Sequence, residues 1–414
     1  MPDFSFGGDG HVRMADVTDP TLAARSASGI DASDVLQLLL DRQERSRAEI
    51  ARALSLSRST IALRLDALKA AGLLRAASQI ASEGGRPTTR IALNDRVRSV
   101  AAIELGHSSS RVSLGDLSAD LLRTVELPVA HTEDFEHILN NALDALTKML
   151  DEIAGIGPLA GITLGLPLSA TLGSVTMQTP SGRAGWMGFP VKEWLEERLN
   201  VPVQVENDVN LMTLGEQLER NDAPDLMLLH AGEGIGVGVV AAGVLVRGNT
   251  GQAGEIAHVP AIRRAEEPCL CGNVGCLSAV ASVPGILKRL RAEGVDVASF
   301  DDLMTRVTNG DSVVAQTLRQ AGRDVGDVMV YTISATNPQY LIVGGALAVA
   351  GDHFVAGVRE ALFRYGAPAL TEGLHVVRSS HPFGAGTSGA LRLAARDVLD
   401  NGALFELLEQ PLAS

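Results

Sequence analysis

Residues 46–74 read SRAEIARALSLSRSTIALRLDALKAAGLL, and this stretch determines how the N-terminal part of the chain folds. Ser46 and Glu49 have the spacing of a capping box, which predicts the start of a short helix. Ser57 is placed to cap a second helix after a tight turn, with apolar residues at 61, 65 and 68 along one face. A short helix, a turn and a longer amphipathic helix form the pattern of a helix-turn-helix.

Two short strands are predicted to follow these helices. Residues 73–80 and 88–93 are apolar or alternating enough for strands, and residues 82–87 between them read SEGGRP. A hairpin after a helix-turn-helix makes a winged helix, and Arg86 near the tip is placed to enter a minor groove or contact phosphate. With a further helix over about residues 31–43, the winged helix is assigned to residues 30–95.

The charge of the chain favours nucleic acid as the partner of this module alone. The net charge is −14 over 414 residues, yet Arg42–Leu93 holds 10 Lys and Arg residues against 4 Asp and Glu. Contacts to phosphate require such a basic module. We therefore predict double-stranded DNA as a partner, contacted by Arg47, Ser57, Arg58, Ser59, Thr60, Arg64 and Arg86. Ser59, Thr60 and Arg64 are expected opposite the apolar stripe of the second helix. A helical bundle that packs on the rest of the protein is the alternative.

The remainder of the chain alternates between strands and helices. Strands are predicted at 100–105, 111–114, 121–129, 160–164, 203–206, 225–230, 237–240 and 340–343, and helices at 133–153, 209–219 and 388–399. This order predicts two α/β lobes with a cleft between them over residues 96–414. Residues 1–29 are expected to form a disordered tail and not a signal peptide. The apolar stretch 226–246 is interrupted by polar residues and Gly, so no membrane partner is expected.

All three cysteines lie within eight positions, as Cys269, Cys271 and Cys276, and His258 precedes the first of them by eleven. Three thiolates and one imidazole form the closed tetrahedral ligand set of a structural zinc ion. The spacing therefore predicts Zn²⁺ in a loop over residues 258–276, where the ion would contribute folding energy. Buried free cysteines and a core histidine are the alternative. So few cysteines, so clustered, favour a reducing compartment and a cytoplasmic location.

Glycine-rich turns follow several predicted strands. Backbone N–H groups in such turns can surround a phosphate, although strand-to-helix turns need glycine in any case. The turns are Glu104–Ser108 (ELGHS), Gly232–Gly236 (GEGIG) and Gly344–Gly345. In their order along the chain, together with Glu206–Asp208 (END), Gly254–His258 (GEIAH) and the cysteines, they resemble the ROK family of repressors, open reading frames and kinases. The resemblance covers about residues 30–400, including the winged helix that the family's regulators carry and its kinases lack.

The resemblance implies an α/β fold class: a winged helix-turn-helix joined to a two-lobed actin-like, sugar-kinase (ribonuclease-H-like) domain. It implies a sugar bound at Asn207, Asp208, Glu255 and His258, with Asp208 at the position of the kinases' base. Carboxylates and amides suit the hydroxyl groups of a polyol. It also implies a zinc ion on the residue types of His258 and the three cysteines. From the residues alone, Asp208 is equally a candidate N-cap of the helix over 209–219.

The chain departs from the family pattern on both sides of the expected cleft. On the sugar side, Ser278 replaces a sugar-contacting Glu, and Pro167-Leu168 replaces a Pro-Gly turn. On the phosphate side, His107 replaces a Gly of the first phosphate loop and Glu233 replaces a Thr of the second. A bulky side chain keeps the backbone away from phosphate, and a carboxylate repels it. We therefore assign no catalytic residue.

These observations predict a cytoplasmic, sequence-specific DNA-binding regulator, specifically a repressor of carbohydrate metabolism genes. A sugar or sugar derivative would control it by binding in the cleft without phosphoryl transfer. We expect a homodimer or homotetramer on a palindromic operator, because the symmetry of the protein and of its site then match. Two alternatives stay open: an ATP-dependent sugar kinase with an accessory DNA-binding module, and a regulator controlled by a protein partner.

Overall fold

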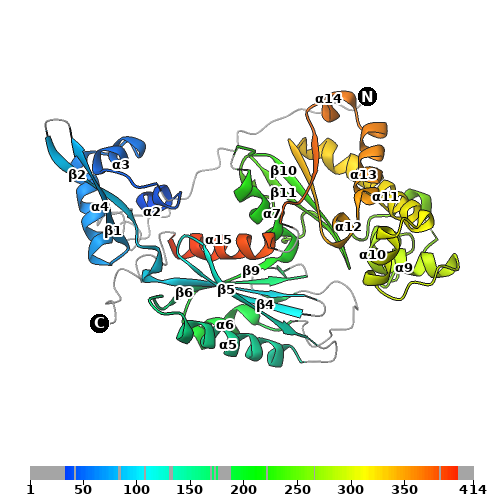
Figure 1. The fold of residues 1–414 in the computed structure, drawn as a ribbon, viewed down its shortest axis with the longest axis horizontal. Coiled ribbons are helices and arrows are strands. Elements are labelled where there is room, and N and C mark those ends of the chain that lie inside the picture. Colours follow the sequence, from blue (N-terminus) through cyan, green and yellow to red (C-terminus); the bar gives the residue numbers. More distant parts are fainter. Residues whose placement is uncertain are drawn as a thin grey trace, which may run out of the picture. The chain divides into compact units, whose positions relative to one another are not determined.

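The computed structural model describes residues 33–399, apart from gaps at 42, 83–84, 107–108, 130–133, 168–169, 172–173, 176–187, 221, 265 and 382–383. The chain divides into a smaller unit that ends at Ala92 and a larger unit that begins at Leu93 (Figure 1). The predicted tail at residues 1–29 lies outside the described residues. Within them, no helix is long and apolar enough to cross a membrane.

The described part of the smaller unit is built from helices and a two-stranded sheet: α2 (Ser33–Leu39), α3 (Arg47–Ala53), α4 (Arg58–Ala70), β1 (Leu74–Ser82) and β2 (Gly85–Leu93). Apolar side chains from the helices and β2 are buried together, among them Val35, Leu36, Ile50, Ile61, Leu65, Leu68 and Ile91. The predicted helix-turn-helix followed by a hairpin is therefore present.

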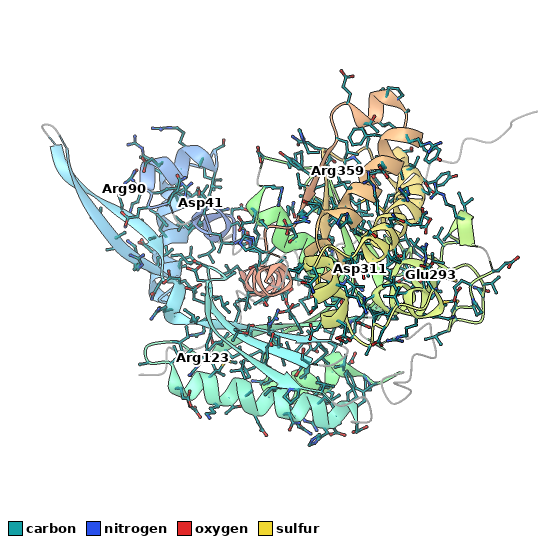
Figure 2. The ribbon with its side chains drawn as sticks, turned by 45° about the vertical axis from the view of Figure 1, so that its right-hand side comes forward. Asp41, Arg90, Arg123, Glu293, Asp311 and Arg359 are labelled. Atoms are coloured by element: carbon teal, nitrogen blue, oxygen red, sulfur yellow. The ribbon has the colours of Figure 1, made fainter. Side chains whose placement is uncertain are left out.

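The capping box at the start of α3 is confirmed. Glu49 N donates to Ser46 Oγ at 3.3 Å, and Ser46 N donates to Glu49 Oε2 at 2.7 Å. Arg90 on β2 also donates to Glu49, at 2.8 Å to Oε1 and 3.0 Å to Oε2 (Figure 2). One carboxylate thus caps α3 and ties that helix to the hairpin. The predicted cap of α4 is confirmed as well, because Thr60 N donates to Ser57 Oγ at 3.1 Å.

The strands of the hairpin are longer than predicted. β1 extends to Ser82 and β2 begins at Gly85, so the prediction of a turn over residues 82–87 is wrong. β2 includes Gly85 and Pro87, since a strand of a hairpin can extend into residue types that favour turns. Residues 83 and 84, and the side chain of Arg86, lie outside the described residues.

The first sheet of the larger unit has the strand order β5-β4-β3-β6-β9. Its strands are β3 (Ser99–Leu105), β4 (Ser109–Asp116), β5 (Leu121–Pro128), β6 (Leu159–Leu166) and β9 (Val203–Asn207). The first three are antiparallel, whereas β6 and β9 run parallel to β3. Side chains of α5 (Phe135–Glu152) and α6 (Val191–Leu199) share a core with one face of this sheet.

The second sheet has the order β12-β11-β10-β13-β14. Its strands are β10 (Leu226–Ala231), β11 (Ile235–Ala241), β12 (Val244–Leu245), β13 (Tyr340–Gly344) and β14 (His375–Arg378). The helices that follow β12 are α8 (Leu277–Ala281), α9 (Val283–Ala292), α10 (Phe300–Thr308), α11 (Ser312–Thr336), α12 (Ala346–Val349), α13 (Asp352–Tyr365) and α14 (Pro368–Thr371). Arg359 of α13 donates to the carbonyl oxygen of Val376 and so fixes α13 to the edge strand β14 (Figure 2). The predicted two-lobed α/β fold is confirmed.

Two helices join the lobes. α7 (Asp208–Glu219) packs on β10 and β11, α15 (Ala385–Leu399) packs on β3 and β6, and the two helices pack on each other (Figure 1). A Cβ atom at Gly215 would lie 1.9 Å from Ala385 O, and one at Gly389 would lie 1.9 Å from Leu211 O. The helices therefore touch backbone to backbone, and we call this contact the glycine seam.

Candidate functional site

A cavity of about 590 Å³ lies at the carboxyl ends of the parallel strands β6 and β9. Leu166 and Asn207 end these strands and face each other in the sheet register. Open α/β folds bind ligands at this edge, where strand ends from one sheet leave a crevice. The four predicted sugar contacts all line the cavity: Asn207, Asp208, Glu255 and His258. Ser278, which replaces the family's Glu, lines it too.

Asn207 connects β9 to α7. Its Oδ1 accepts hydrogen bonds from Val209 N at 2.9 Å and Asn210 N at 3.1 Å, which makes Asn207 the N-cap. The prediction that Asp208 caps this helix is therefore wrong. The strand ends one residue later than predicted, so Asn207 takes the extended cap conformation and Asp208 becomes the first residue of the helix.

The Asp208 carboxyl group lies in a low-dielectric and negatively charged environment. The pKa of Asp208 is raised to about 7, chiefly by burial and also by the nearby carboxylates of Glu104 and Glu255, against a hydrogen bond from Val209 N that lowers it. Near neutral pH this carboxyl group is therefore close to half protonated. It can donate a hydrogen bond in one form and accept hydrogen bonds in the other.

Glu104, near the end of β3, is a half-buried carboxylate at the start of the first glycine-rich turn, and the sequence predicts no role for it. Thr387 Oγ1 donates to Glu104 Oε1 from the first turn of α15. A Cβ atom at Gly386 would lie 2.3 Å from Glu104 Oε2, so the carboxylate packs against the helix backbone. Burial raises the pKa of Glu104. His107 and Ser108 of the same loop lie outside the described residues.

Glu206 forms an ion pair that links the two sheets beside the cavity. Its Oε2 accepts from Arg247 Nε at 2.6 Å, while Oε1 accepts from Asn207 N at 2.9 Å and Asn210 Nδ2 at 2.8 Å. Glu206 is on β9, the edge strand of the first sheet, and Arg247 follows β12, the edge strand of the second. One carboxylate thus holds both the start of α7 and the neighbouring lobe.

Glu233 lies in the turn between β10 and β11. Gly232 N donates to Gly234 O at 2.9 Å, and Val283 N at the start of α9 donates to Gly232 O at 2.9 Å. The Glu233 side chain is exposed to solvent and lines the cavity. The second glycine-rich turn therefore presents a carboxylate to the cavity, as the sequence predicted from the replacement of Thr.

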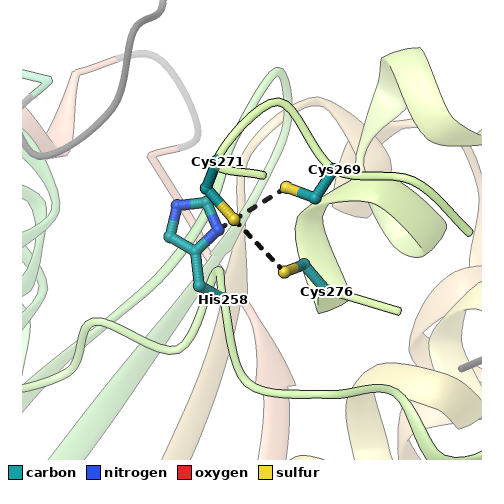
Figure 3. Close-up of side chains that lie close together, drawn as sticks. All are labelled: His258, Cys269, Cys271 and Cys276. Carbon is teal, nitrogen blue, oxygen red and sulfur yellow. Dashed lines mark hydrogen bonds between the residues drawn. The ribbon is translucent and has the colours of Figure 1, made fainter. Parts of the chain in front are cut away.

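The four predicted metal ligands come together beside the cavity (Figure 3). Their donor atoms all lie within 4.8 Å of one another, in the group His258, Cys269, Cys271 and Cys276. Cys269 Sγ lies 3.6 Å from His258 Nδ1, and Cys271 Sγ lies 3.6 Å from Cys276 Sγ. Tetrahedral zinc with Zn–S distances of about 2.3 Å places two sulfurs about 3.8 Å apart. The residues therefore fit a tetrahedral ion with soft ligands.

Glycine turns shape the cysteine loop. Gly272 and Gly275 have φ angles of 90° and 72°, which side-chain-bearing residues rarely adopt. The turn closes through hydrogen bonds from Cys269 N to Asn273 O at 2.9 Å and from Gly272 N to Cys269 O at 3.1 Å. Burial, together with the neighbouring thiols of Cys271 and Cys269, raises the pKa of the Cys276 thiol to about 12.

The candidate DNA contacts of the smaller unit fall into two groups. Arg47, Ser57, Arg58 and Ser59 are exposed, and Thr60 is half-buried beside them. Arg64 is only 8% exposed, and its Nη1 lies 3.6 Å from Asp34 Oδ2. The prediction that Arg64 faces solvent is therefore wrong. At helical spacing it shares a face with the buried residues 61, 65 and 68, so its aliphatic stem packs inward.

Two α/β lobes on a pair of joining helices, with the cavity between strand ends, define the class of actin-like sugar-kinase folds. Residues 100–397 match the sequence model of the ROK family, and the chain belongs to this family. It is 27% identical over 387 residues to the DNA-binding transcriptional dual regulator NagC of Escherichia coli (strain K12), which covers 88% of this chain and 92% of that relative. A xylose repressor of Caldicellulosiruptor bescii is 25% identical over 346 residues, covering 79% of this chain and 86% of the relative.

Kinases of the family are also similar to the chain. A glucokinase of Halalkalibacterium halodurans is 29% identical over 293 residues, covering 66% of this chain and 87% of the relative. Among solved structures, a ROK family transcriptional regulator described as a homolog of the E. coli MLC protein matches with a TM-score of 0.78 and 22% identity, over 92% of this chain and 99% of that one. A ROK hexokinase from Thermus thermophilus matches with a TM-score of 0.62 and 28% identity, over 73% of this chain and all of that one (100%).

Proposed function

We propose that this protein is a cytoplasmic transcriptional repressor of carbohydrate metabolism genes that binds DNA through its smaller unit and a sugar effector in its cavity. The observation that carries the proposal is the convergence of Asn207, Asp208, Glu255 and His258 on one cavity of a chain that also holds a winged helix. The relatives named as regulators match more of the chain than the glucokinase does, 88% and 79% against 66%. This difference supports the regulator over the kinase.

The larger unit would act as a sensor. A sugar that contacts Asn207 and Asp208 at one sheet and Glu255 at the other favours one spacing of the lobes. DNA affinity then changes because the two conformations differ in how a homodimer presents its winged helices to a palindromic site. Zn²⁺ held by His258 and the three cysteines would stabilise the loop over residues 258–276, which follows Glu255 directly. The metal has no part in the chemistry, because its four protein ligands leave no open position.

Phosphoryl transfer is not part of the proposal. Catalysis of that reaction depends on positive charge and backbone donors around the phosphates, whereas Glu233 places a carboxylate in the second glycine-rich turn. The glucokinase relative makes a sugar kinase the second candidate. A coupled assay decides between them: sugar-dependent ATP turnover that Asp208→Asn abolishes would establish the kinase, and its absence supports the regulator.

DNA binding is tested on the exposed start of α4. Fragments of genomic DNA selected by the full-length protein provide the operator, and fluorescence anisotropy then measures affinity against salt concentration. Arg58→Ala should weaken binding about tenfold and reduce the salt slope by about one phosphate contact. Arg123→Ala, an exposed arginine of the larger unit, is the matched control and should leave both unchanged. Equal affinities for the two variants would contradict the placement of α4 on DNA.

Effector binding is tested by calorimetric titration of the full-length protein with a panel of sugars. Asn207→Ala should abolish the heat of binding of any sugar that binds the wild type, because it removes a polar group from the cavity. A flat titration across the panel, with operator binding intact, would favour control by a protein partner instead.

A further inference from the structure

The cavity is lined by carboxylates with little opposing charge. Asp208, Glu233 and Glu255 all line it, and the half-buried carboxylate of Glu104 is close enough to Asp208 to raise the pKa of Asp208. Among the described residues that line the cavity, the one Lys or Arg side chain is Lys288. Its Nζ donates to Glu267 Oε1, so its charge is already paired.

The neighbouring cations are paired as well. Arg247 donates to Glu206 at 2.6 Å, and Arg111, which faces Glu104 across the β3–β4 register, donates to Glu126 at 3.1 Å. Of the two imidazoles on the cavity, His258 lies 3.6 Å from Cys269 Sγ in the metal-ligand group. The other, His230, lies against the glycine-rich turn, with Nε2 3.0 Å from where a Cβ at Gly232 would stand. The described surroundings of the cavity are thus net negative.

This charge falls where a phosphate on the sugar would lie. In a sugar kinase, the phosphoryl group passes between the hydroxyl held by the base and the phosphate-binding turns. The corresponding residues here are Asp208 and, in the second turn, Glu233, both of which line the cavity. A sugar phosphate bound in the same orientation would therefore bring its dianion toward the Glu233 carboxylate, whereas a free hydroxyl would meet hydrogen-bonding partners.

We propose that the effector is a neutral, unphosphorylated sugar, and that Glu233 excludes the corresponding sugar phosphate. This inference rests on the proposed function, because it assumes that a sugar occupies the cavity. It adds which form of the sugar is the signal: the regulator responds to a sugar before phosphorylation and not to the product of a kinase. The cavity volume of about 590 Å³ equals that of about twenty water molecules at about 30 Å³ each, which leaves room for such a ligand.

The test compares matched pairs of ligands on the full-length protein with its metal bound. Isothermal calorimetry measures the affinity of glucose against glucose 6-phosphate, and of N-acetylglucosamine against its 6-phosphate. In the wild type, the neutral member of the pair that binds should bind at least about a hundredfold more tightly. Glu233→Gln should reduce this preference at least about tenfold, because it removes one negative charge and keeps the shape of the side chain.

Two controls separate charge selection from structural damage. Glu293→Gln, which changes an exposed carboxylate of the same lobe paired with Arg289, should leave the preference at the wild-type value. Raising the salt concentration should narrow the preference in the wild type more than in Glu233→Gln, because salt screens the charge of the exposed Glu233.

The outcomes distinguish the two proposals. Equal or tighter binding of the sugar phosphate by the wild type overturns the inference and leaves the proposed function standing. An unchanged preference in Glu233→Gln also overturns it, since the selection then has another cause. If neither member of any pair binds while operator binding is intact, both the inference and the proposed sugar effector fail.

Discussion

The two ends of the cavity are built in different ways. The thiol and imidazole end draws all four of its donor atoms from residues 258–276, within one loop. The carboxylate end draws Asp208 from α7 and Glu233 from the β10–β11 turn, and Glu104 of β3 is near enough to raise the pKa of Asp208. The first end gathers groups that a cation can hold together, whereas the second gathers like charges that only the surrounding fold holds together. With an ion bound by the first group, one cavity would owe its shape to a metal on one side and to the placement of two lobes on the other.

Removal of one metal ligand should cause the largest loss of stability. Cys271→Ser removes one thiolate, and we expect it to destabilise the larger unit by more than about 3 kcal/mol, because a structural zinc ion contributes directly to folding. Scanning calorimetry should show a decrease in melting temperature of roughly 10 °C. Elemental analysis of the same samples should show a metal-to-protein ratio near one in the wild type and much less in the variant.

Leu270→Ser provides the matched control. This side chain is 83% exposed in the same loop and donates no ligand, so its replacement should cost less than about 0.5 kcal/mol. Similar melting of Cys271→Ser and the wild type would show that the loop folds without the ion. The surrounding fold, and not a cation, would then hold the groups at both ends of the cavity.

The carboxylate end should show its character in the pH dependence of stability. The pKa of Asp208 is about 7 in the folded protein, above its ordinary value of 3.8, so the folded state binds the proton more tightly than the unfolded chain. Its contribution to the free energy of unfolding is therefore full below about pH 4 and falls as pH rises to about 7. Asp208→Asn should remove this decrease in the free energy of unfolding and stabilise the protein at pH 8 by up to about 4 kcal/mol.

Urea denaturation of the wild type and Asp208→Asn between pH 4.5 and 8 measures this difference without effector. Asp352→Asn, at a carboxylate with a side chain 94% exposed, should follow the wild-type profile. If the free energies of unfolding of Asp208→Asn and the wild type differed by the same amount at all pH values, the buried charge of Asp208 would not be what distinguishes the carboxylate end.

The smallest of the three changes in the free energy of unfolding concerns the ion pair between Glu206 and Arg247, which holds the carboxylate end in place. Arg247→Ala leaves the Glu206 carboxylate, whose side chain is 9% exposed, without its cation, and should cost about 1–2 kcal/mol. Arg123→Ala breaks a pair in which both side chains are exposed, 44% and 42%, and should cost less than about 0.5 kcal/mol. Chemical denaturation measures both, and equal costs would remove the distinction between the link across the lobes and an ordinary surface pair.

The same contrast explains what the sequence could predict. Residue types and spacing alone predict the candidate metal-ligand group, because all four residues lie in one short segment. The sugar-facing residues needed a family resemblance, since no spacing relates Asp208 to Glu255. The Thr387–Glu104 hydrogen bond joins residues 283 positions apart, and Arg247 is one of 35 Lys and Arg residues. No local sequence pattern identifies the partner of Glu104 or singles out Arg247.

The errors have local physical causes. Arg64 was placed on the solvent side because arginine is charged, although its stem is apolar and helical spacing puts it beside residues 61, 65 and 68. Asn and Asp are equally good caps, so the choice between Asn207 and Asp208 depended on the last residue of β9. β14 (His375–Arg378) was not located because a four-residue edge strand carries too short a pattern.

The glycine seam has a consequence for genetics. Neither Gly215 nor Gly389 lines the cavity or belongs to the metal-ligand group. Even alanine would place a carbon 1.9 Å from a carbonyl oxygen at either position. In a saturation-mutagenesis screen for gene repression, we expect both positions to accept only glycine. A map of mutational intolerance would therefore mark these two residues as strongly as the metal ligands, although they bind nothing.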